Sequence, residues 1–210
     1  LWLSSAIKLR LHGSKGVTSG GATLSMLLQL DRVGADTVRV AVNLSPREAA
    51  KIPADEILLG RCALRGVAPD RIEVEITEET ALDLNVIRTR LMPLSKAGVR
   101  IVIDDFGEGY SSLQSIRYVR VSRLKIDRSF AADLGKGESV VRLMRALVGL
   151  GHALDMEVVA EGVESAEAAR TLADIGCDYL QGYYLSRPMT AGAIMKLPFD
   201  TGPGFRSDTA

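Results

Sequence analysis

The 210-residue chain is poor in the residues that build sulfur or imidazole sites. It contains two cysteines, Cys62 and Cys177, and two histidines, His12 and His152. These are too few and too scattered for a disulfide framework or a structural zinc site. Because the fold needs no disulfides, we expect a reducing, cytoplasmic setting.

Long apolar runs and an excess of charge are also missing. No run approaches the roughly 18 apolar residues that cross a bilayer, and Lys8 and Arg10 interrupt the N-terminal LWLSSAIKLRLHG, so it is a poor signal peptide. The 26 basic residues balance the 26 acidic ones, which argues against a nucleic-acid polymer or an anionic membrane as the partner. Because the first residue is Leu1, we expect a piece of a longer chain.

Short β-rich runs alternate with helical stretches along nearly the whole sequence. The predicted strands are 6–12, 37–43, 71–77, 99–104, 122–126, 156–160, 178–181 and 183–185. Helices are predicted over about 80–98, starting at Thr80 or Asp83 with Leu84, Ile87, Leu91 and Leu94 on one face, and over 139–154 and 165–176. Strand–helix alternation implies a mainly parallel sheet.

Eight strands in about 200 residues favour an α/β fold of the (β/α)₈ TIM-like barrel type. A doubly wound open sheet is the alternative, but the sequence lacks the glycine-rich dinucleotide fingerprint. The barrel domain is expected over residues 1–197. The tail 198–210 is rich in Gly, Pro and polar residues and is expected to be flexible.

Polar side chains stand at or near the ends of the apolar runs. In a parallel barrel the carboxyl ends of the strands share one mouth, so these groups are expected to converge. The set is Asn43, Glu75, Glu78, Asp104, Asp105, Lys125, Glu161 and Gln181. A structural role as polar caps of the barrel rim explains one or two of these residues, not the whole set.

The predicted site offers oxygen donors and no sulfur or imidazole, which favours Mg²⁺ or Mn²⁺ over zinc. Adjacent aspartates with glutamates on neighbouring strands are suited to a metal pair that promotes displacement at a phosphodiester. Lys125 would hold the water or neutralise phosphate charge. The following FGEGYSS segment, with Gly107 and Gly109, predicts a tight loop that covers the site or binds phosphate.

Six motifs in order give a specific resemblance: VNLS (42–45), EITE (75–78), DDFGEGYSSL (104–113), LKIDRSF (124–130), VVAEGVES (158–165) and CDYLQGYYLSRPM (177–189). The chain resembles the EAL-domain family of bacterial cyclic-di-GMP phosphodiesterases from about residue 22 to 197. The resemblance implies a modified (β/α)₈ barrel whose first strand is antiparallel. It also implies cleavage of one phosphodiester of cyclic di-GMP to a linear dinucleotide, with two Mg²⁺ or Mn²⁺ ions.

The resemblance also implies residue roles. Asn43, Glu75 and Asp104 correspond to ligands of the first metal, Asp104 bridges to the second, and Asp105 lies beside it. Lys125 corresponds to the residue that contacts the catalytic water, Glu161 to a further acid at that centre and Gln181 to a polar, substrate-binding partner. Glu78 corresponds to the anchor of the glycine loop, and Asp127 and Glu164 to supporting polar groups.

Two departures from the family pattern matter. Glu108 replaces the threonine of the usual DFGTGYSS loop, and the family's first-strand glutamate has no counterpart. In one interpretation the true first strand lies upstream of Leu1, leaving an unpaired edge. In the other, which we favour, AIKLRLH is a degenerate first strand, Ala6 replaces the glutamate, and Arg10 matches a ligand-binding arginine.

The missing carboxylate leaves two functions open. The first is a cyclic-di-GMP phosphodiesterase, with turnover weakened by the lost ligand. The second is a catalytically silent domain that binds cyclic di-GMP or a protein partner. An unrelated Mg²⁺-dependent barrel enzyme would fit the residues but not the motif series. The resemblance further implies a homodimer and fused sensory or cyclase domains outside this chain.

Overall fold

A parallel, curled β-sheet forms the centre of the molecule in the computed structural model, which describes residues 6–8, 20–35, 38–107 and 119–197. Within these ranges the sheet has seven strands in sequence order, each parallel to the next. They are β1 (Ala6–Lys8), β2 (Arg39–Leu44), β3 (Ile72–Thr77), β4 (Arg100–Phe106), β5 (Val121–Ile126), β6 (Glu157–Ala160) and β7 (Tyr179–Leu180).

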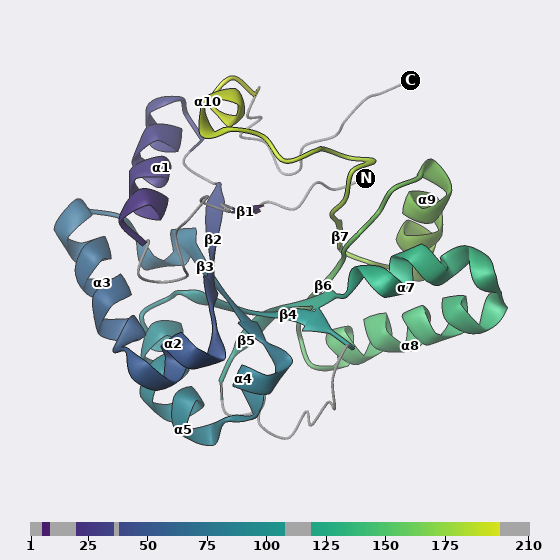
Figure 1. Ribbon diagram of the computed structural model, residues 1–210, viewed down its shortest axis with the longest axis horizontal. Helices are drawn as coiled ribbons and strands as arrows, with labels where there is room; N and C mark the ends of the chain where they lie inside the picture. The colour runs from purple at the N-terminus through teal and green to yellow at the C-terminus, as the bar shows by residue number, and fades with distance from the viewer. Residues whose placement is uncertain (1–5, 9–19, 36–37, 108–118, 198–210) are drawn as a thin grey trace.

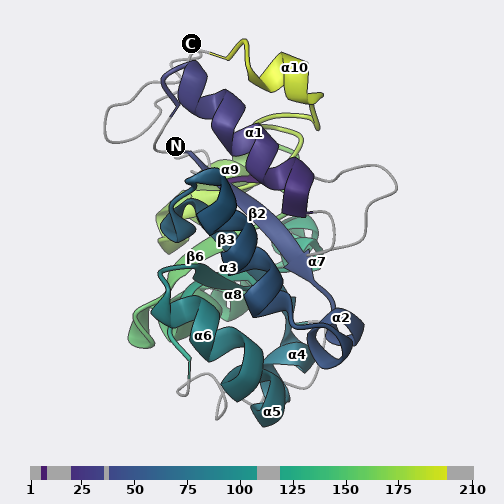
Figure 2. The same ribbon diagram turned by 90° about the vertical axis from the view of Figure 1, so that its left-hand side faces the viewer.

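Helices connect the strands and lie on the outer side of the curled sheet (Figure 1). They are α1 (Gly20–Arg32), α2 (Pro46–Lys51), α3 (Ala54–Arg65), α4 (Glu78–Leu82), α5 (Leu84–Val86), α6 (Met92–Lys96), α7 (Arg128–Asp133), α8 (Glu138–Ala153), α9 (Ala166–Ile175) and α10 (Ala191–Ile194). Short turns of other helical types are η2 (Pro69–Arg71), η3 (Ile87–Leu91) and η5 (Leu134–Lys136). Figure 2 shows α1 and α3 running along the same outer side.

Two apolar clusters join the helices to the sheet. The larger contains residues of β2 to β5 with α1, α3 and the segment from α5 to α6. The smaller lies between β6, α8 and α9, where Met144, Val148, Val158 and Leu172 are buried. The outward-facing residues of these strands are apolar because helices cover the outer face, and on β3 and β5 charged residues alternate with them. This arrangement confirms the predicted TIM-like α/β architecture, and the described strands make an open, curled sheet rather than a ring of eight.

One strand prediction is not confirmed and another is wrong. The first strand was expected to be antiparallel or degenerate, and the described β1 pairs with β2 in parallel, with Ala6 opposite Arg39. The expected strand 183–185 is a turn, because Leu185 N–H and Ser186 N–H both donate to the carbonyl of Gly182. The parallel direction of β1 follows from α1, since a helical crossover returns the chain to the same end of the sheet.

The helix expected over 80–98 is interrupted. Asp83 caps α5 as predicted, with Oδ1 accepting from the N–H groups of Asn85 and Val86 at 2.9 and 3.1 Å. A π-helical turn then changes the helical phase over Ile87–Leu91. Ile87, Leu91 and Leu94 are buried as expected, whereas Leu84 is 44% exposed at the start of the helix. The helices predicted over 139–154 and 165–176 are confirmed as α8 and α9.

In the part of the chain that the structure describes, no helix combines the length and the apolar character that a membrane span requires.

We expect opposite effects from two glycine substitutions in α8. A Cβ at Gly151 would overlap Cγ2 of Val158 on β6, whereas a Cβ at Gly149 would meet no atom within 4 Å. Gly151→Ala should lower the free energy of unfolding by about 1–3 kcal/mol through overpacking. Gly149→Ala should raise it by about 0.5–1 kcal/mol, because alanine is the better helix former. Urea denaturation measures both, and equal effects would contradict the close packing of α8 on β6.

Candidate active site

Lys125 lies at the centre of a group of carboxylates where the strands end. Its Nζ is 3.0 Å from Glu75 Oε1 and 2.7 Å from Asp104 Oδ1, and it also forms an ion pair with Glu161 Oε1. Glu75 is on β3, Asp104 on β4, Lys125 on β5 and Glu161 directly after β6. Four consecutive strands therefore each deliver one charged group to the same place, as the sequence predicted.

The ammonium group of Lys125 is almost completely buried, with 4% of its side chain exposed. Burial alone lowers the pKa of a lysine, but the charges of Glu75, Asp104 and Glu161 outweigh burial and raise the pKa of Lys125 well above its ordinary value. These carboxylates therefore favour the charged form of Lys125, whose ammonium can donate hydrogen bonds to them.

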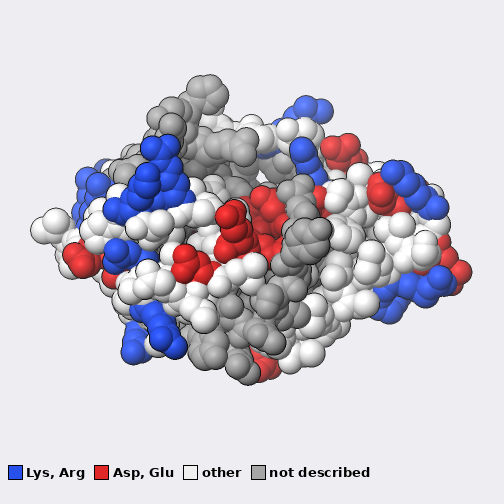
Figure 3. Space-filling view, turned by 60° about the horizontal axis from the view of Figure 1, so that its bottom comes forward, with Lys and Arg blue, Asp and Glu red and all other residues white. Residues whose placement is uncertain are grey.

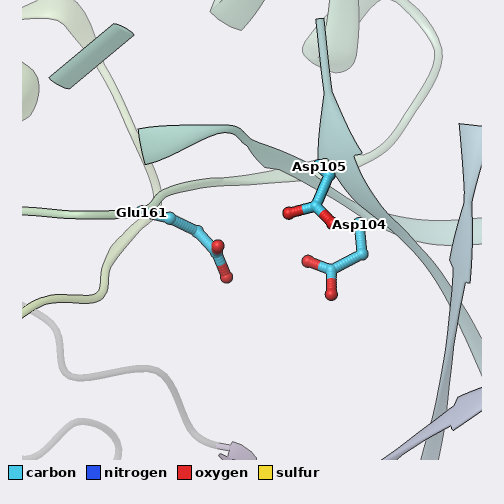
Figure 4. A group of neighbouring side chains, drawn as sticks. All are labelled: Asp104, Asp105 and Glu161. Atoms are coloured by element: carbon cyan, nitrogen blue, oxygen red, sulfur yellow. The ribbon is translucent and has the colours of Figure 1, made fainter. Parts of the chain in front are cut away.

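The two adjacent aspartates face the same space despite being neighbours in a strand. Side chains normally alternate between the faces of a strand. Here the β4–β5 register shifts between Ile103 and Phe106, and Asp105 has a left-handed backbone with φ 53°. This bulge turns both carboxylates toward Glu161 (Figure 4). One oxygen from each of Asp104, Asp105 and Glu161 lies within 4.8 Å of the others.

Asn43 and Gln181 lie at the edges of this site. Asn43 is in register with Glu75 on the neighbouring strand, so both residues are on the same face of the sheet, and Asn43 is exposed. The main chain of Gln181 is fixed beside the end of β6, since its N–H donates to Ala160 O at 2.9 Å and its carbonyl accepts from Val163 N–H at 3.0 Å.

On the face turned forward in Figure 3, acidic side chains gather near the middle and basic ones lie toward the rim.

The start of the glycine loop is tied to α4. Gly107 N–H donates to Glu78 Oε2 at 3.4 Å, which is the contact expected of Glu78 as a loop anchor. Gly107 has φ 103°, and a Cβ there would overlap the ring of Phe130. Only glycine combines this backbone with this close approach.

Two residues expected to support the site lie apart from the Lys125 contacts. Asp127 caps α7, with Oδ1 accepting from Ser129 N–H at 2.8 Å. Burial acts to raise the pKa of Asp127, but hydrogen bonds from Ser129 and the main chain of Arg128 outweigh it and lower the pKa. Glu164 is exposed in the loop before α9. Arg10, Glu108 and Gly109 lie outside the described residues.

A second charged layer lies one step deeper in the sheet, and the sequence analysis missed it. Arg123 Nη1 contacts both carboxylate oxygens of Glu73 at 3.1 and 3.0 Å, and Arg123 Nη2 is 2.8 Å from Glu157 Oε2. Glu73 and Arg123 are two residues before Glu75 and Lys125, so the signal was the alternation in IEVEIT and SRLKI. We call Glu73, Arg123 and Glu157 the lower layer, and Glu75, Asp104, Lys125 and Glu161 the upper layer.

The upper layer and Asp105 together hold four carboxylates and one ammonium group among the described residues. This excess of closely spaced anionic oxygens fits hard divalent cations, which prefer carboxylate ligands. An ammonium beside such oxygens is suited to stabilising negative charge that develops on a phosphate. The arrangement is thus chemically suited to phosphoester hydrolysis with divalent cations.

Comparison with known proteins links this geometry to one family. A family model described as "EAL domain" matches residues 21–188. The chain is 38% identical over 175 residues to MucR of Pseudomonas aeruginosa, a bifunctional diguanylate cyclase and cyclic di-GMP phosphodiesterase. That match covers 83% of this chain and 25% of MucR. The chain spans between 19% and 25% of the length of the first curated relatives that it matches.

Solved structures agree with this result. The EAL domain of Mycobacterium smegmatis DcpA superposes with a TM-score of 0.82 at 32% identity, covering 90% of this chain and 86% of that one. The MucR phosphodiesterase in complex with cyclic di-GMP gives a TM-score of 0.75 at 32% identity, covering 84% and 73%. Klebsiella pneumoniae BlrP1, with manganese and cyclic di-GMP, gives 0.68 at 27% identity, covering 79% and 42%.

We expect Lys125→Met to destabilise the metal-free fold by about 3–5 kcal/mol, because it leaves buried carboxylates without their cation. The pKa of Lys125 is raised in the folded state. The stabilisation that its charge gives the folded protein is therefore fully present at any pH below the pKa of a lysine in the unfolded chain. That stabilisation is lost only when the pH rises through the folded-state value. Urea denaturation in EDTA at pH 7 measures the loss. The control is Lys136→Met, which removes an exposed pair with Asp133 and should cost less than about 0.5 kcal/mol.

We expect Asp105→Gly to weaken Mn²⁺ binding, because it removes one of three clustered carboxylates while glycine adopts the left-handed backbone readily. Asp155 has the same backbone, with φ 57°, in the turn after α8. Asp155→Gly should therefore keep the wild-type Mn²⁺ affinity. Mn²⁺ calorimetry compares the two, and unchanged Mn²⁺ binding in both variants would remove Asp105 from the site.

Proposed function

The chain belongs to the EAL-domain family, and on that premise we propose that it hydrolyses cyclic di-GMP to a linear dinucleotide in bacterial second-messenger signalling. One observation carries the proposal. The contacts of Lys125 with Glu75, Asp104 and Glu161, with Asp105 beside them, form a charged site at the ends of the strands. Relatives with a named phosphodiesterase activity support the choice of substrate.

We propose that two divalent cations, Mg²⁺ or Mn²⁺, bind this site. The residues that would hold them are Asn43, Glu75, Asp104, Asp105 and Glu161. Support comes from the spacing of Asp104, Asp105 and Glu161 and from the manganese in the BlrP1 structure. When bound, such ions activate water as a nucleophile and stabilise charge on the phosphate oxygens.

Hydrolysis adds the oxygen of water to phosphorus and breaks one phosphorus–oxygen ester bond. The departing proton needs an acceptor, and the site offers clustered carboxylates. Glu161 and Asp105 are therefore the carboxylates proposed to take the proton. Lys125 donates hydrogen bonds that hold the water or the phosphate, and its charge offsets the negative charge that develops there.

Substrate binding is proposed for Gln181, whose main chain is fixed beside Glu161. The role of Arg10 stays a prediction from the family resemblance. The domain over residues 1–197, the homodimer, the fused sensory or cyclase domains and the cytoplasmic location also stay predictions.

The alternative is a domain that binds cyclic di-GMP without cleaving it. The observation that favours it is Ala6 on β1, at the position where the family resemblance places a metal-ligating glutamate. Both functions share the ligand and the fold, so only a measurement of turnover separates them.

The test is incubation of the purified chain with cyclic di-GMP and Mn²⁺, with products separated by chromatography and bound nucleotide measured in parallel. We expect linear dinucleotide that disappears with EDTA. Glu161→Gln should lower kcat by about 100-fold or more, because it removes both an anionic ligand and a proton acceptor. The matched control is Glu167→Gln on the exposed first turn of α9, which should keep wild-type turnover.

The outcomes separate the candidate functions. Wild-type turnover in Glu161→Gln would refute the assigned site. Tight binding of cyclic di-GMP without any product would establish the silent receptor instead, and a chain that neither binds nor cleaves the nucleotide would refute both.

A further inference from the structure

The lower layer repeats the strand pattern of the upper layer. Arg123 on β5 pairs with Glu73 on β3, and two residues further along the same strands Lys125 pairs with Glu75. Arg123 also pairs with Glu157 at the start of β6, and Lys125 with Glu161 just past its end. Because side chains two residues apart lie on the same face of a strand, the two layers are stacked.

The lower layer connects strands that are not neighbours. Strands β3 and β5 lie on either side of β4, about 10 Å apart in a flat sheet. The long inward side chains of these strands meet across β4, and the guanidinium of Arg123 bridges Glu73 on β3 and Glu157 on β6. The guanidinium also lies 4.6 Å from the ring centre of Tyr179 on β7. The hydroxyl of Tyr179 in turn donates to Glu157 at 3.1 Å.

The two layers differ in how easily their cation is displaced. Arg123 and Glu73 are each 2% exposed, and the planar guanidinium forms several directed hydrogen bonds. Lys125 is a single point charge on a flexible stem in the layer where divalent cations would compete for the same oxygens. The lower layer can therefore keep the strands at a fixed spacing while the contacts of the upper layer change.

We propose that Arg123, together with Glu73 and Glu157, is a positioning device that sets the spacing of Glu75, Asp104 and Glu161 for cation binding. Glu73 and Glu75 are both on β3, and Arg123 and Lys125 are both on β5. Any shift of β3 relative to β5 therefore moves Glu75 relative to Lys125. Arg123 does not touch the reacting groups and acts through the residues above it. The inference rests on the proposed function and deepens it.

The test variant is Glu73→Gln/Arg123→Met. This variant removes the two fully buried charges together, and such exchanges are often neutral for stability. Glu157, whose side chain is 37% exposed, keeps Arg100 at 3.7 Å and the hydroxyl of Tyr179. We expect a urea midpoint near that of the wild type but Mn²⁺ affinity weaker by about 10–100-fold in calorimetry of the metal-free protein. We also expect kcat for cyclic di-GMP to fall more than KM changes, because remote positioning alters the reacting geometry rather than nucleotide contacts.

The matched control is Asp55→Asn/Arg90→Met, which removes a part-buried pair between α3 and η3, away from the upper layer. It should keep wild-type Mn²⁺ affinity. A third variant, Arg123→Lys, keeps the charge but cannot bridge Glu73 and Glu157 in the same way. We expect its Mn²⁺ affinity to fall between those of the wild type and the double variant.

A folded double variant with wild-type Mn²⁺ affinity would overturn the positioning role. If the double variant does not fold, the lysine variant decides: weaker Mn²⁺ binding supports the role and wild-type binding overturns it. A wild-type chain that binds no Mn²⁺ would overturn the proposed function and this inference together. If the wild-type chain hydrolyses cyclic di-GMP and the double variant has the same kcat and the same Mn²⁺ affinity, this inference alone would be overturned.

Discussion

The buried ammonium of Lys125 is the interaction on which the site depends. The ends of β3, β4 and β6 bring carboxylates within a few ångströms of one another, and such a cluster would repel itself in a low-dielectric interior. Lys125 supplies the positive charge from within the chain, so the metal-free protein can keep the ligands together. The same protonated group is then in place to offset the charge of a phosphate. Stability and proposed chemistry therefore share one side chain.

The curled sheet brings inward side chains of several strands toward one another, and charged pairs join them. Inward side chains of β3 and β5 meet across β4 twice, at Arg123 and at Lys125. Apolar packing of helices on the outer face explains why the sheet folds but not why these strands have this spacing. The two charged layers add that specificity, each with a different exposure and a different cation.

Much of this arrangement was predictable from the sequence because it depends on local pattern. Strand–helix alternation gave the parallel sheet, and polar residues at strand ends gave Glu75, Asp104, Lys125 and Glu161. The π-helical turn near Ile87 and the turn at Gly182 were not predicted, because tertiary contacts override the apolar spacing there. The lower layer was missed because alternating charges in a strand usually mark a solvated face. Here the curl buries Glu73 and Arg123 instead.

The left-handed backbone of Asp105 gains its meaning from where it occurs. Aspartate tolerates this conformation better than most residues, and Asp155 adopts it in the turn after α8. In a regular strand, two neighbouring residues direct their side chains to opposite faces. At Asp105 the same backbone turns a second carboxylate into the space that Asp104 and Glu161 face. One unusual φ angle thus doubles the number of carboxylates that β4 can present on one side of the sheet.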